Sequence, residues 1–467
     1  MHASTSLRVV TATAVATLSL VLPVSAEETV LGVYVFHRHG DRFAKSWPPT
    51  VLTALGADEV YSSGSYYRSR YVSENATNRI VAMAPDLVQL SQGLYPPAGG
   101  VAQQTLANGS VVEAPLGGYQ YIPINVATSS AAAGSSSEDS TWLEGGSGCE
   151  NAVISRNSYL LSLQYQATLN AIQDFYQSLL PAINTTFNSA SASFKSAYTI
   201  YDYVHVSEIH NVTISGSDVL TDAALFQLQT RADQHEWGLA CNSSDPVRAI
   251  AGAVLAAQIL QGLNATEISP SSAPHMSFQF GTYATFMSFF VLANLPAASP
   301  QFYGVVDYAA SMAFELVTNA SVSTTLVLDP SDISVRFMFS NGSAALTGGL
   351  TEFALFGQAE TVLPWSTFAT EMSTFAVGDT ASWCKICGNS TGVCSASSLG
   401  TSSTSDSGST TTGSSSGNIS RPVAGVIGAM VTFSVILGLK LLAMLLGGLR
   451  VVKKDVAAAG KVAQIGL

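Results

Sequence analysis

The sequence predicts an α/β fold in which a central sheet is flanked by helices and a mostly α-helical second domain is inserted. A run rich in β-branched and aromatic residues at 30–36 indicates a buried strand. Apolar residues then recur at helical spacing over much of residues 157–263. Alternating apolar residues at Met276, Phe278 and Phe280 mark a return to strands. This order of strand, helices and strand is the pattern of an α/β domain interrupted by a helical insert.

A cluster of cations around a glycine directly follows the first predicted strand, as Arg38-His39-Gly40-Asp41-Arg42. In open α/β sheets, ligands bind at the carboxyl ends of strands, so this position suits chemistry. Gly40 allows a tight bend or a close approach to a ligand. Arg38 and Arg42 carry planar guanidinium groups suited to bidentate contact with a tetrahedral oxyanion. Between these two permanent cations His39 is biased toward its neutral form, which leaves a ring nitrogen able to attack phosphorus.

A solvated basic loop is the alternative interpretation of this segment. Within five positions directly after a hydrophobic strand, four residues, namely two arginines, a histidine and a glycine, are of the types that a phosphate site needs. This favours a phosphate-handling site instead. The motif resembles the Arg-His-Gly-x-Arg signature of the histidine acid phosphatases, the secreted branch of the phosphoglycerate mutase-like superfamily that includes phytases. The resemblance implies a phosphoglycerate mutase-like fold, a catalytic phosphohistidine at His39 and a phosphate clamp made by Arg38 and Arg42. It implies no metal and no cofactor.

The resemblance continues past the motif. Leu52-Thr53-Ala54-Leu55-Gly56 is similar to the family's Leu-Thr-x-x-Gly segment, which precedes a helix. We expect that helix at residues 58–72. It contains Arg68 and Arg70, which we expect to be solvated and to have no catalytic role.

The chain departs from the family pattern after that helix. The family places a third phosphate-binding arginine on a strand before a segment similar to Gly93-Leu94-Tyr95-Pro96-Pro97. Here Arg79 is the last arginine before that segment, and the interval is shortened. Either Arg79 is a displaced substitute or the third clamp is absent, and we favour absence.

A second departure affects the family's His-Asp pair, whose His helps to bind phosphate and whose Asp protonates the departing oxygen. Alignment on Phe314-Glu315-Leu316, which matches a strand of the family, puts that pair at Thr282-Tyr283. Neither residue matches. His275, on the preceding strand, is more often a packed or surface histidine than a replacement ligand.

Composition limits the partners of this 467-residue chain. Its formal net charge of -12 argues against a nucleic-acid partner. Charged residues make up only 11%, against roughly 25% in average soluble proteins. Glycans would keep such a surface polar. Their candidate acceptors are the Asn-x-Ser/Thr asparagines Asn75, Asn108, Asn184, Asn211, Asn242, Asn264, Asn319, Asn341, Asn389 and Asn418.

Three segments predict targeting to a membrane. Residues 1–26 have the charged start, apolar run and Val-Ser-Ala end of a secretory signal peptide. Residues 395–420 form a Ser/Thr/Gly-rich stalk. Residues 423–449 have the length and apolarity of a membrane span, followed by a basic flank in the tail at 450–467. We expect a single-pass type I protein of the cell membrane or secretory pathway, with its ectodomain extracellular or lumenal.

The five cysteines fit an oxidising compartment. Cys384-x-x-Cys387 with Cys394 could bind zinc, but no histidine lies nearby in sequence, so disulfides are the favoured interpretation. Cys149 and Cys241 complete the set. Because the number is odd, at least one thiol is unpaired or bonded to another chain.

Within the predicted insert, the apolar spacing indicates one long helix over residues 161–179 and an apolar, buried helix at 247–263. His235-Glu236-Trp237 lies between them. A packed helix end is the favoured interpretation of this trio, and a binding site is the alternative.

We therefore expect a phosphatase-like ectodomain that acts on a small phosphomonoester. The alternatives are a degenerate pseudophosphatase that binds phosphate and a cell-surface glycoprotein in which the fold is only a scaffold. The predicted α/β domain comprises residues 27–130 and 270–394, and the predicted helical domain comprises residues 131–269.

Overall fold

The computed structural model describes residues 28–76, 78–80, 103–105, 111–113, 148–268, 275–322 and 328–395. The predicted signal peptide, most of the shortened interval before residue 97, the stalk, the membrane span and the tail lie outside these residues. The strands are β1 Thr29–Arg38, β2 Gln103–Thr105, β3 Val111–Glu113, β4 Met276–Gly281, β5 Ser311–Thr318, β6 Ile333–Ser340, β7 Thr351–Glu352 and β8 Val362–Pro364.

The α-helices are α1 Ala54–Tyr71, α2 Glu150–Leu160, α3 Leu163–Ala171, α4 Gln173–Ser178, α5 Leu180–Ile183, α6 Ala197–His210, α7 Val212–Ser215, α8 Asp222–Ala240, α9 Ile250–Ile268, α10 Tyr283–Leu292, α11 Trp365–Ser373 and α12 Thr380–Cys387. Short 3-10 turns occur at η1 Phe194–Ser196, η2 Pro246–Ala249, η3 Leu295–Ala297, η4 Pro300–Tyr303, η5 Pro330–Asp332 and η6 Gly392–Cys394.

A mixed sheet forms the centre of the described structure, in the order β4-β1-β5-β6, with β7 and β8 both paired to β6. Strand β1 runs parallel to β4 and antiparallel to β5. Arg38 at the end of β1 lies opposite Gly281 at the end of β4. The predicted α/β class is confirmed, as are the strands expected around residues 30–36, 276–280 and 333–339.

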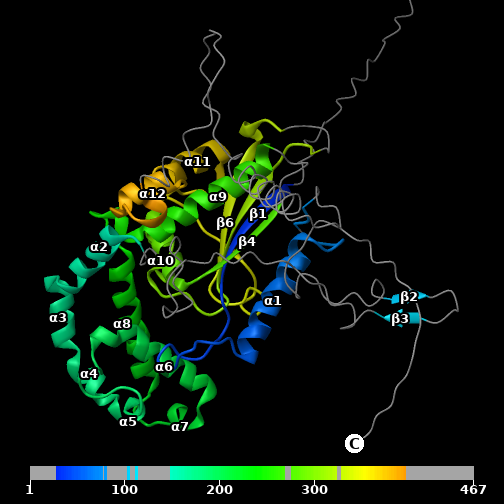
Figure 1. The fold of residues 1–467 in the computed structure, drawn as a ribbon. Helices are drawn as coiled ribbons and strands as arrows, with labels where there is room; N and C mark the ends of the chain where they lie inside the picture. The colour runs from blue at the N-terminus through cyan, green and yellow to red at the C-terminus, as the bar shows by residue number, and fades with distance from the viewer. Residues whose placement is uncertain are drawn as a thin grey trace, which may run out of the picture. The chain divides into compact units, whose positions relative to one another are not determined.

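The two faces of β1 are covered by different helices, because successive side chains of a strand point to opposite faces. Val33 and Val35 pack in a cluster with Tyr67 and Tyr71 of α1. Phe36, on the other face, packs with residues of α9 and α10. Figure 1 shows α1 on one side of the strands and α9 and α10 on the other. The sheet is therefore the middle layer of three.

A separate apolar cluster holds α3 to α8 together, away from the strands. The prediction of one helix over residues 161–179 is wrong, because α2 ends at Leu160 and α3 and α4 follow as separate helices. The side chain of Ser162 accepts a hydrogen bond from the Tyr165 amide and starts α3 as its N-cap. Leu161 is 80% exposed at this break. The apolar spacing continues across this break, but the capping serine interrupts the helix.

Helix α9 confirms the buried helix expected at 247–263. Together with the turn before it, Pro246–Glu267 is the one described segment long and apolar enough to cross a membrane. Most of it is buried in the protein, and it packs against β1 and α10. Its apolarity is therefore that of a core helix.

Disulfides link Cys149 to Cys387 and Cys384 to Cys394. This pairing confirms the disulfide interpretation of the Cys384-x-x-Cys387 motif. Cys241 remains a thiol, and burial raises its pKa to about 11.

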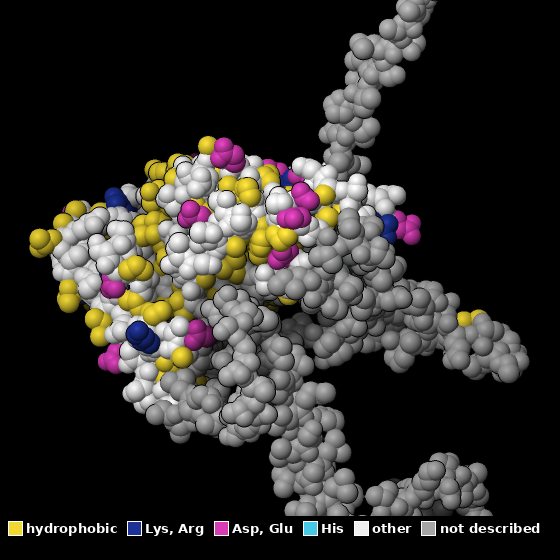
Figure 2. All heavy atoms as spheres, turned by 90° about the horizontal axis from the view of Figure 1, so that it is seen from above, with side chains coloured by type: hydrophobic (Ala, Val, Ile, Leu, Met, Phe, Trp, Pro, Cys, Tyr) yellow, Lys and Arg dark blue, Asp and Glu magenta, His cyan; other side chains and the backbone are white. Residues whose placement is uncertain are grey.

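Uncharged and hydrophobic side chains cover most of the described part of the face in Figure 2. Asp and Glu are scattered among them, and Lys and Arg are few. This agrees with the low content of charged residues and the acidic balance of the sequence.

Candidate active site

The predicted motif lies where β1 leaves the sheet. The backbone N–H of Arg38 donates to the Ala310 carbonyl at 2.8 Å, and the Ala309 N–H donates to the His39 carbonyl at 2.9 Å. Ala309 has φ +56°, a left-handed conformation that is uncommon for a residue with a side chain. Backbone strain of this kind concentrates at functional sites. The segment before β5 thus holds the end of β1 in a fixed position.

Two glycines allow the motif to contact α1. A Cβ on Gly40 would lie 2.1 Å from the Gly56 carbonyl oxygen, and a Cβ on Gly56 would lie 2.0 Å from the Asp41 carbonyl oxygen. Neither position can therefore hold a side chain while the two segments stay this close. Thr53 caps α1 and also donates a hydrogen bond to the Asp41 carboxylate. The Leu-Thr-x-Leu-Gly resemblance thus has a structural reason, since this segment is packed against the motif.

Arg38 is 4% exposed, and its guanidinium lies among aromatic rings and backbone carbonyls. Its Nη1 donates to the Val306 carbonyl, and its Cζ lies 4.6 Å from the centre of the Tyr308 ring. Its Nε is buried and has no hydrogen-bond partner among the described residues. Arg38 also lines a cavity of about 470 Å³. A phosphate oxygen is the kind of acceptor that this cation lacks.

His39 is half-buried beside Arg38. Its Nδ1 lies 2.8 Å from the Gly40 carbonyl oxygen, which can only accept, so this nitrogen carries the proton. Nε2 is then the nitrogen with the lone pair, as a nucleophilic histidine requires. The ring centre lies 5.7 Å from that of Tyr308.

Arg42, the second predicted clamp, is engaged by an acid that sequence reasoning missed. Its Nη1 lies 3.0 Å from Oδ1 of Asp202, on α6, and both side chains are almost fully buried. The same carboxylate accepts the Lys45 amide at 2.7 Å. A carboxylate therefore already contacts Arg42 through Nη1. The sequence signal was a lone Asp among the apolar and aromatic residues of α6.

Two more acidic groups belong to the site, one beside the motif and one within it. Glu59, on α1, accepts the Asp41 amide at 2.7 Å. Burial raises the pKa of Glu59, and the neighbouring carboxylates of Asp41 and Asp307 act in the same direction. Asp41 itself is fully buried and lies 2.7 Å from Nε2 of His210. Asp41 belongs to the predicted motif, where no role was expected for it, and Glu59 was not predicted as part of the site.

The position expected to hold the family's His-Asp pair adjoins the end of β1, as the alignment implied. Thr282 is the N-cap of α10, directly after β4, and Tyr283 is buried. The Tyr283 hydroxyl donates to Glu236 at 2.9 Å, and burial raises the pKa of Tyr283 well above its ordinary value. Neither side chain is an acid at working pH, so the departure from the family pattern affects the site directly.

Two residues considered as replacements for the missing phosphate-binding groups lie away from the motif. His275 directly precedes β4 and so lies at the opposite end of the paired strands β1 and β4, where its Nδ1 contacts the Leu31 carbonyl at 2.8 Å. Arg79 is exposed next to the C-terminal end of α1, roughly 25 Å along that helix from the motif. Neither residue replaces the missing groups.

Arg70 is not solvated as expected. It pairs with the fully buried Glu315 of β5 at 2.8 Å, and Arg336 pairs with the other oxygen of Glu315 at 2.6 Å. The Arg70–Glu315 ion pair attaches α1 to the sheet. Neither ion pair includes a residue of the motif. His235 is buried inside α8, with Nδ1 2.8 Å from Glu236, which agrees with the packed interpretation of that trio.

The cavity beside Arg38 is acidic overall. Asp202, Glu208, Asp222 and Asp307 line it, and Arg38 is the only lysine or arginine among its described lining residues. Across the described ranges, no group of three or more His, Cys, Asp or Glu side chains is placed to hold a metal ion. The site thus combines one buried cation, Arg38, with several acidic side chains around the same cavity.

No family model matches the chain, and no curated protein matches it. Solved structures of histidine acid phosphatases do match. The phytase of Citrobacter braakii is 11% identical with a TM-score of 0.46, over 77% of this chain and 99% of that one. A Hafnia alvei phytase in complex with myo-inositol hexakis sulphate is 14% identical with a TM-score of 0.46, over 76% and 98%.

A multiple inositol polyphosphate phosphatase of Bifidobacterium longum, in complex with phosphate, is 11% identical with a TM-score of 0.42, over 75% of this chain and 93% of that one. These proteins belong to the family that the Arg-His-Gly-Asp-Arg motif resembles.

Proposed function

We propose that this chain is a histidine acid phosphatase-like protein that hydrolyses small phosphomonoesters through a phosphohistidine at His39. One observation carries the proposal. The His39 ring, whose Nδ1 lies 2.8 Å from the Gly40 carbonyl oxygen, follows the buried Arg38 at the carboxyl end of β1, and Arg38 lines a cavity of about 470 Å³.

The chemistry follows from these groups. Nε2 of His39 attacks phosphorus, an N–P bond forms, and the bond from phosphorus to the ester oxygen breaks, so that the alcohol departs as an alkoxide or phenolate and takes a proton from solvent. Arg38 stabilises the negative charge on the phosphoryl oxygens, and Arg42 does so to the extent that Asp202 releases it. Water then attacks the phosphohistidine, which yields inorganic phosphate and returns His39 to its starting form.

Quenching of the full-length protein in alkaline detergent during turnover of radiolabelled nitrophenyl phosphate tests the proposal. We expect label on the protein that is stable in base and labile in acid, as a phosphoramidate is. His39→Ala should abolish both the label and the hydrolysis. His275→Ala is the matched histidine control, because His275 lies at the other end of the strands from the motif. This variant should retain both the label and the hydrolysis. Label or hydrolysis that persists in His39→Ala would refute the nucleophile.

A catalytically degenerate protein that binds phosphate is the second candidate. The Arg42–Asp202 pair and the absence of an acid at Thr282-Tyr283 favour it. Saturable phosphate binding without any trapped phosphohistidine would select this alternative over the enzyme.

We also propose that the chain is a single-pass type I membrane glycoprotein. The apolar run at 423–449, the basic flank after it and the signal-like residues 1–26 support this topology. Protease treatment of intact cells should remove the ectodomain and spare the tail. An ectodomain that survives, without glycans, would refute the topology.

A further inference from the structure

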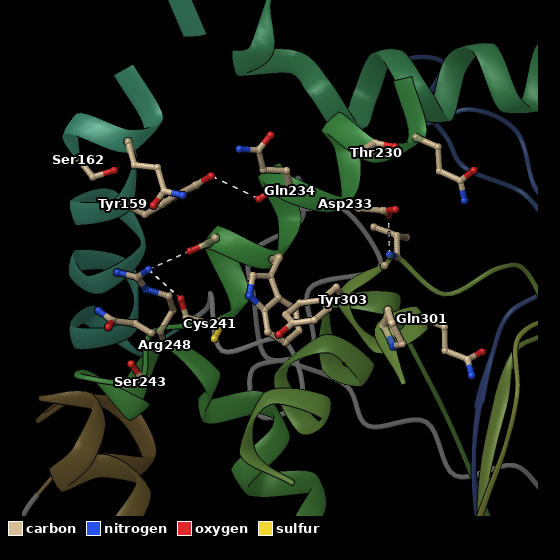
Figure 3. A pocket seen from close by; sticks show the side chains of 18 of the residues that line it. Tyr159, Ser162, Thr230, Asp233, Gln234, Cys241, Ser243, Arg248, Gln301 and Tyr303 are labelled. Carbon is tan, nitrogen blue, oxygen red and sulfur yellow. Dashed lines mark hydrogen bonds between the residues drawn. The ribbon is translucent and has the colours of Figure 1, made fainter. Parts of the chain in front are cut away.

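A second and larger cavity, of about 930 Å³, lies between α2, α8 and the turn η4. In the view of Figure 3, Tyr303 lies in the middle of this cavity, with Arg248 on one side and Gln301 on the other. It shares part of its wall with the Arg38 cavity, through Gln229, Val305 and Asn341. Neither Arg38 nor His39 lines it.

The cavity is close to electrically neutral. Among the described residues that line it, Asp233 and Arg248 are the only charged ones. The Arg248 guanidinium is already used, since it donates to the carbonyls of Gly238 at 2.9 Å and Cys241 at 3.1 Å and to Ser155 and Ser158. A site without an available cation does not select phosphates or other anions.

Asp233 contributes little charge at mildly acidic pH. Burial raises its pKa to about 6, although the Val305 N–H donates to its carboxylate at 2.8 Å. Figure 3 shows this contact at the edge of the cavity. When protonated, Asp233 can both donate and accept a hydrogen bond.

The remaining polar lining consists of side-chain amides and hydroxyls, among them Gln229, Gln301 and Thr230. A side-chain amide offers donors and an acceptor in one plane, which suits a ligand with several hydroxyl groups. An aromatic pair adds apolar surface. The Trp237 and Tyr303 rings lie 4.7 Å apart in an edge arrangement, and Tyr303 is 50% exposed.

We propose that this cavity binds an uncharged saccharide. A sugar ring has an apolar C–H face that packs on an aromatic ring and a rim of hydroxyls that needs neutral donors and acceptors. The cavity supplies both and lacks the charges that other polar ligands require. The inference is independent of the proposed phosphatase activity.

The saccharide can have two sources. One is a glycan on another molecule. The other is this chain's own N-glycan, because Asn242 lines the cavity and begins an Asn-Ser-Ser acceptor sequence. The recognition chemistry is the same, and glycosylation distinguishes the sources.

Calorimetric titration of the full-length protein with chitotriose and mannotriose tests the proposal, with sialyllactose and a heparin disaccharide as charged comparators. The protein is assayed as expressed in a glycosylating host, after enzymatic deglycosylation, and as Asn242→Gln. We expect at least one neutral probe to bind. Binding only after deglycosylation, or only in Asn242→Gln, identifies the chain's own glycan as the occupant.

Tyr303→Ala and Gln229→Ala should each weaken binding of that probe about tenfold, the loss of one stacking or hydrogen-bonding group. Tyr61→Ala is the matched control, because Tyr61 is a tyrosine of similar exposure on α1, and it should leave binding unchanged. Absence of binding to both neutral probes in all three forms would overturn the proposal. So would tighter binding of the charged saccharides, or equal weakening by Tyr61→Ala.

Discussion

Asp202 holds Arg42 at 3.0 Å inside the protein, although the two residues are 160 positions apart in sequence. Arg42 belongs to the motif after β1, and Asp202 belongs to α6 of the helical lobe, which comprises helices α3 to α8. The pair is buried, and Asp202 contacts Arg42 through Nη1. We expect a phosphate that uses this nitrogen to compete with the carboxylate.

Asp202→Asn should strengthen phosphate binding by about tenfold or more, because Arg42 loses its anionic partner. Without ligand, the variant should be less stable by about 3–5 kcal/mol, the usual effect of leaving a buried charge unpaired. Added phosphate should therefore raise its Tm more than that of the wild type. Thermal melts across a phosphate titration measure both effects.

Asp222→Asn is the control for this experiment, because Asp222 lines the same cavity and no contact to Arg42 is seen for it in the described structure. An equal gain in phosphate binding by Asp222→Asn would mean that removing any negative charge from the cavity is enough to produce the effect. Weaker phosphate binding by Asp202→Asn would show that Asp202 positions Arg42 for phosphate instead of competing with it.

The leaving group should decide which esters react. With no acid at Thr282-Tyr283, an alkoxide has no proton donor there, a loss of roughly 10²–10⁴ in rate. Nitrophenolate leaves without a proton. We therefore expect weak hydrolysis of nitrophenyl phosphate and almost none of glycerol or inositol phosphates, measured as phosphate release at acidic pH.

Comparable rates on alkyl and aryl esters would point to another donor. Glu59 is then the first group to replace, because its carboxyl lies within hydrogen-bond distance of the motif and its pKa is raised. Glu59→Gln should suppress the alkyl rate selectively, whereas His275→Ala should change neither rate.

His37 should make the protein sensitive to acid. Burial lowers its pKa to about 4, although its contact with the Arg38 carbonyl opposes this effect. Between pH 4 and its ordinary pKa near 6.5, the unfolded chain binds more protons at His37 than the folded one does. Stability should thus fall by about 3 kcal/mol as pH drops through this window.

Chemical denaturation at a series of pH values measures that slope. His37→Phe keeps an aromatic ring against Phe280, whose ring centre lies 5.3 Å away, and it should flatten the slope. A slope that is unchanged in the variant would show that other groups cause the acid sensitivity.

Glu315 should be a major determinant of stability. Glu315→Gln should cost about 3–5 kcal/mol, because Arg70 and Arg336 would lose their shared buried partner. Urea denaturation compares it with Glu360→Gln, which changes an exposed carboxylate and should shift the midpoint little. Equal stability of the two variants would mean that the arginines find other partners.

The sequence predicted the parts of the fold and site that depend on neighbouring residues. Strand β1, the Gly40 bend and helix α1 follow from local patterns, and the alignment placed Thr282-Tyr283 correctly beside the motif. Asp202 could not be predicted, because only the packing of α6 against the motif gives it a role. The break at Ser162 was missed for a related reason, since apolar spacing continued through a residue that caps a new helix.

The Cys149–Cys387 disulfide joins positions 238 residues apart. All of the described helical lobe and every described strand after β3 lie between these two cysteines. The intervening chain is thus a closed covalent ring. A protease that makes one cut in a surface loop of this ring opens it without releasing a fragment. The nicked molecule keeps its mass, and its pieces separate only when the disulfide is reduced.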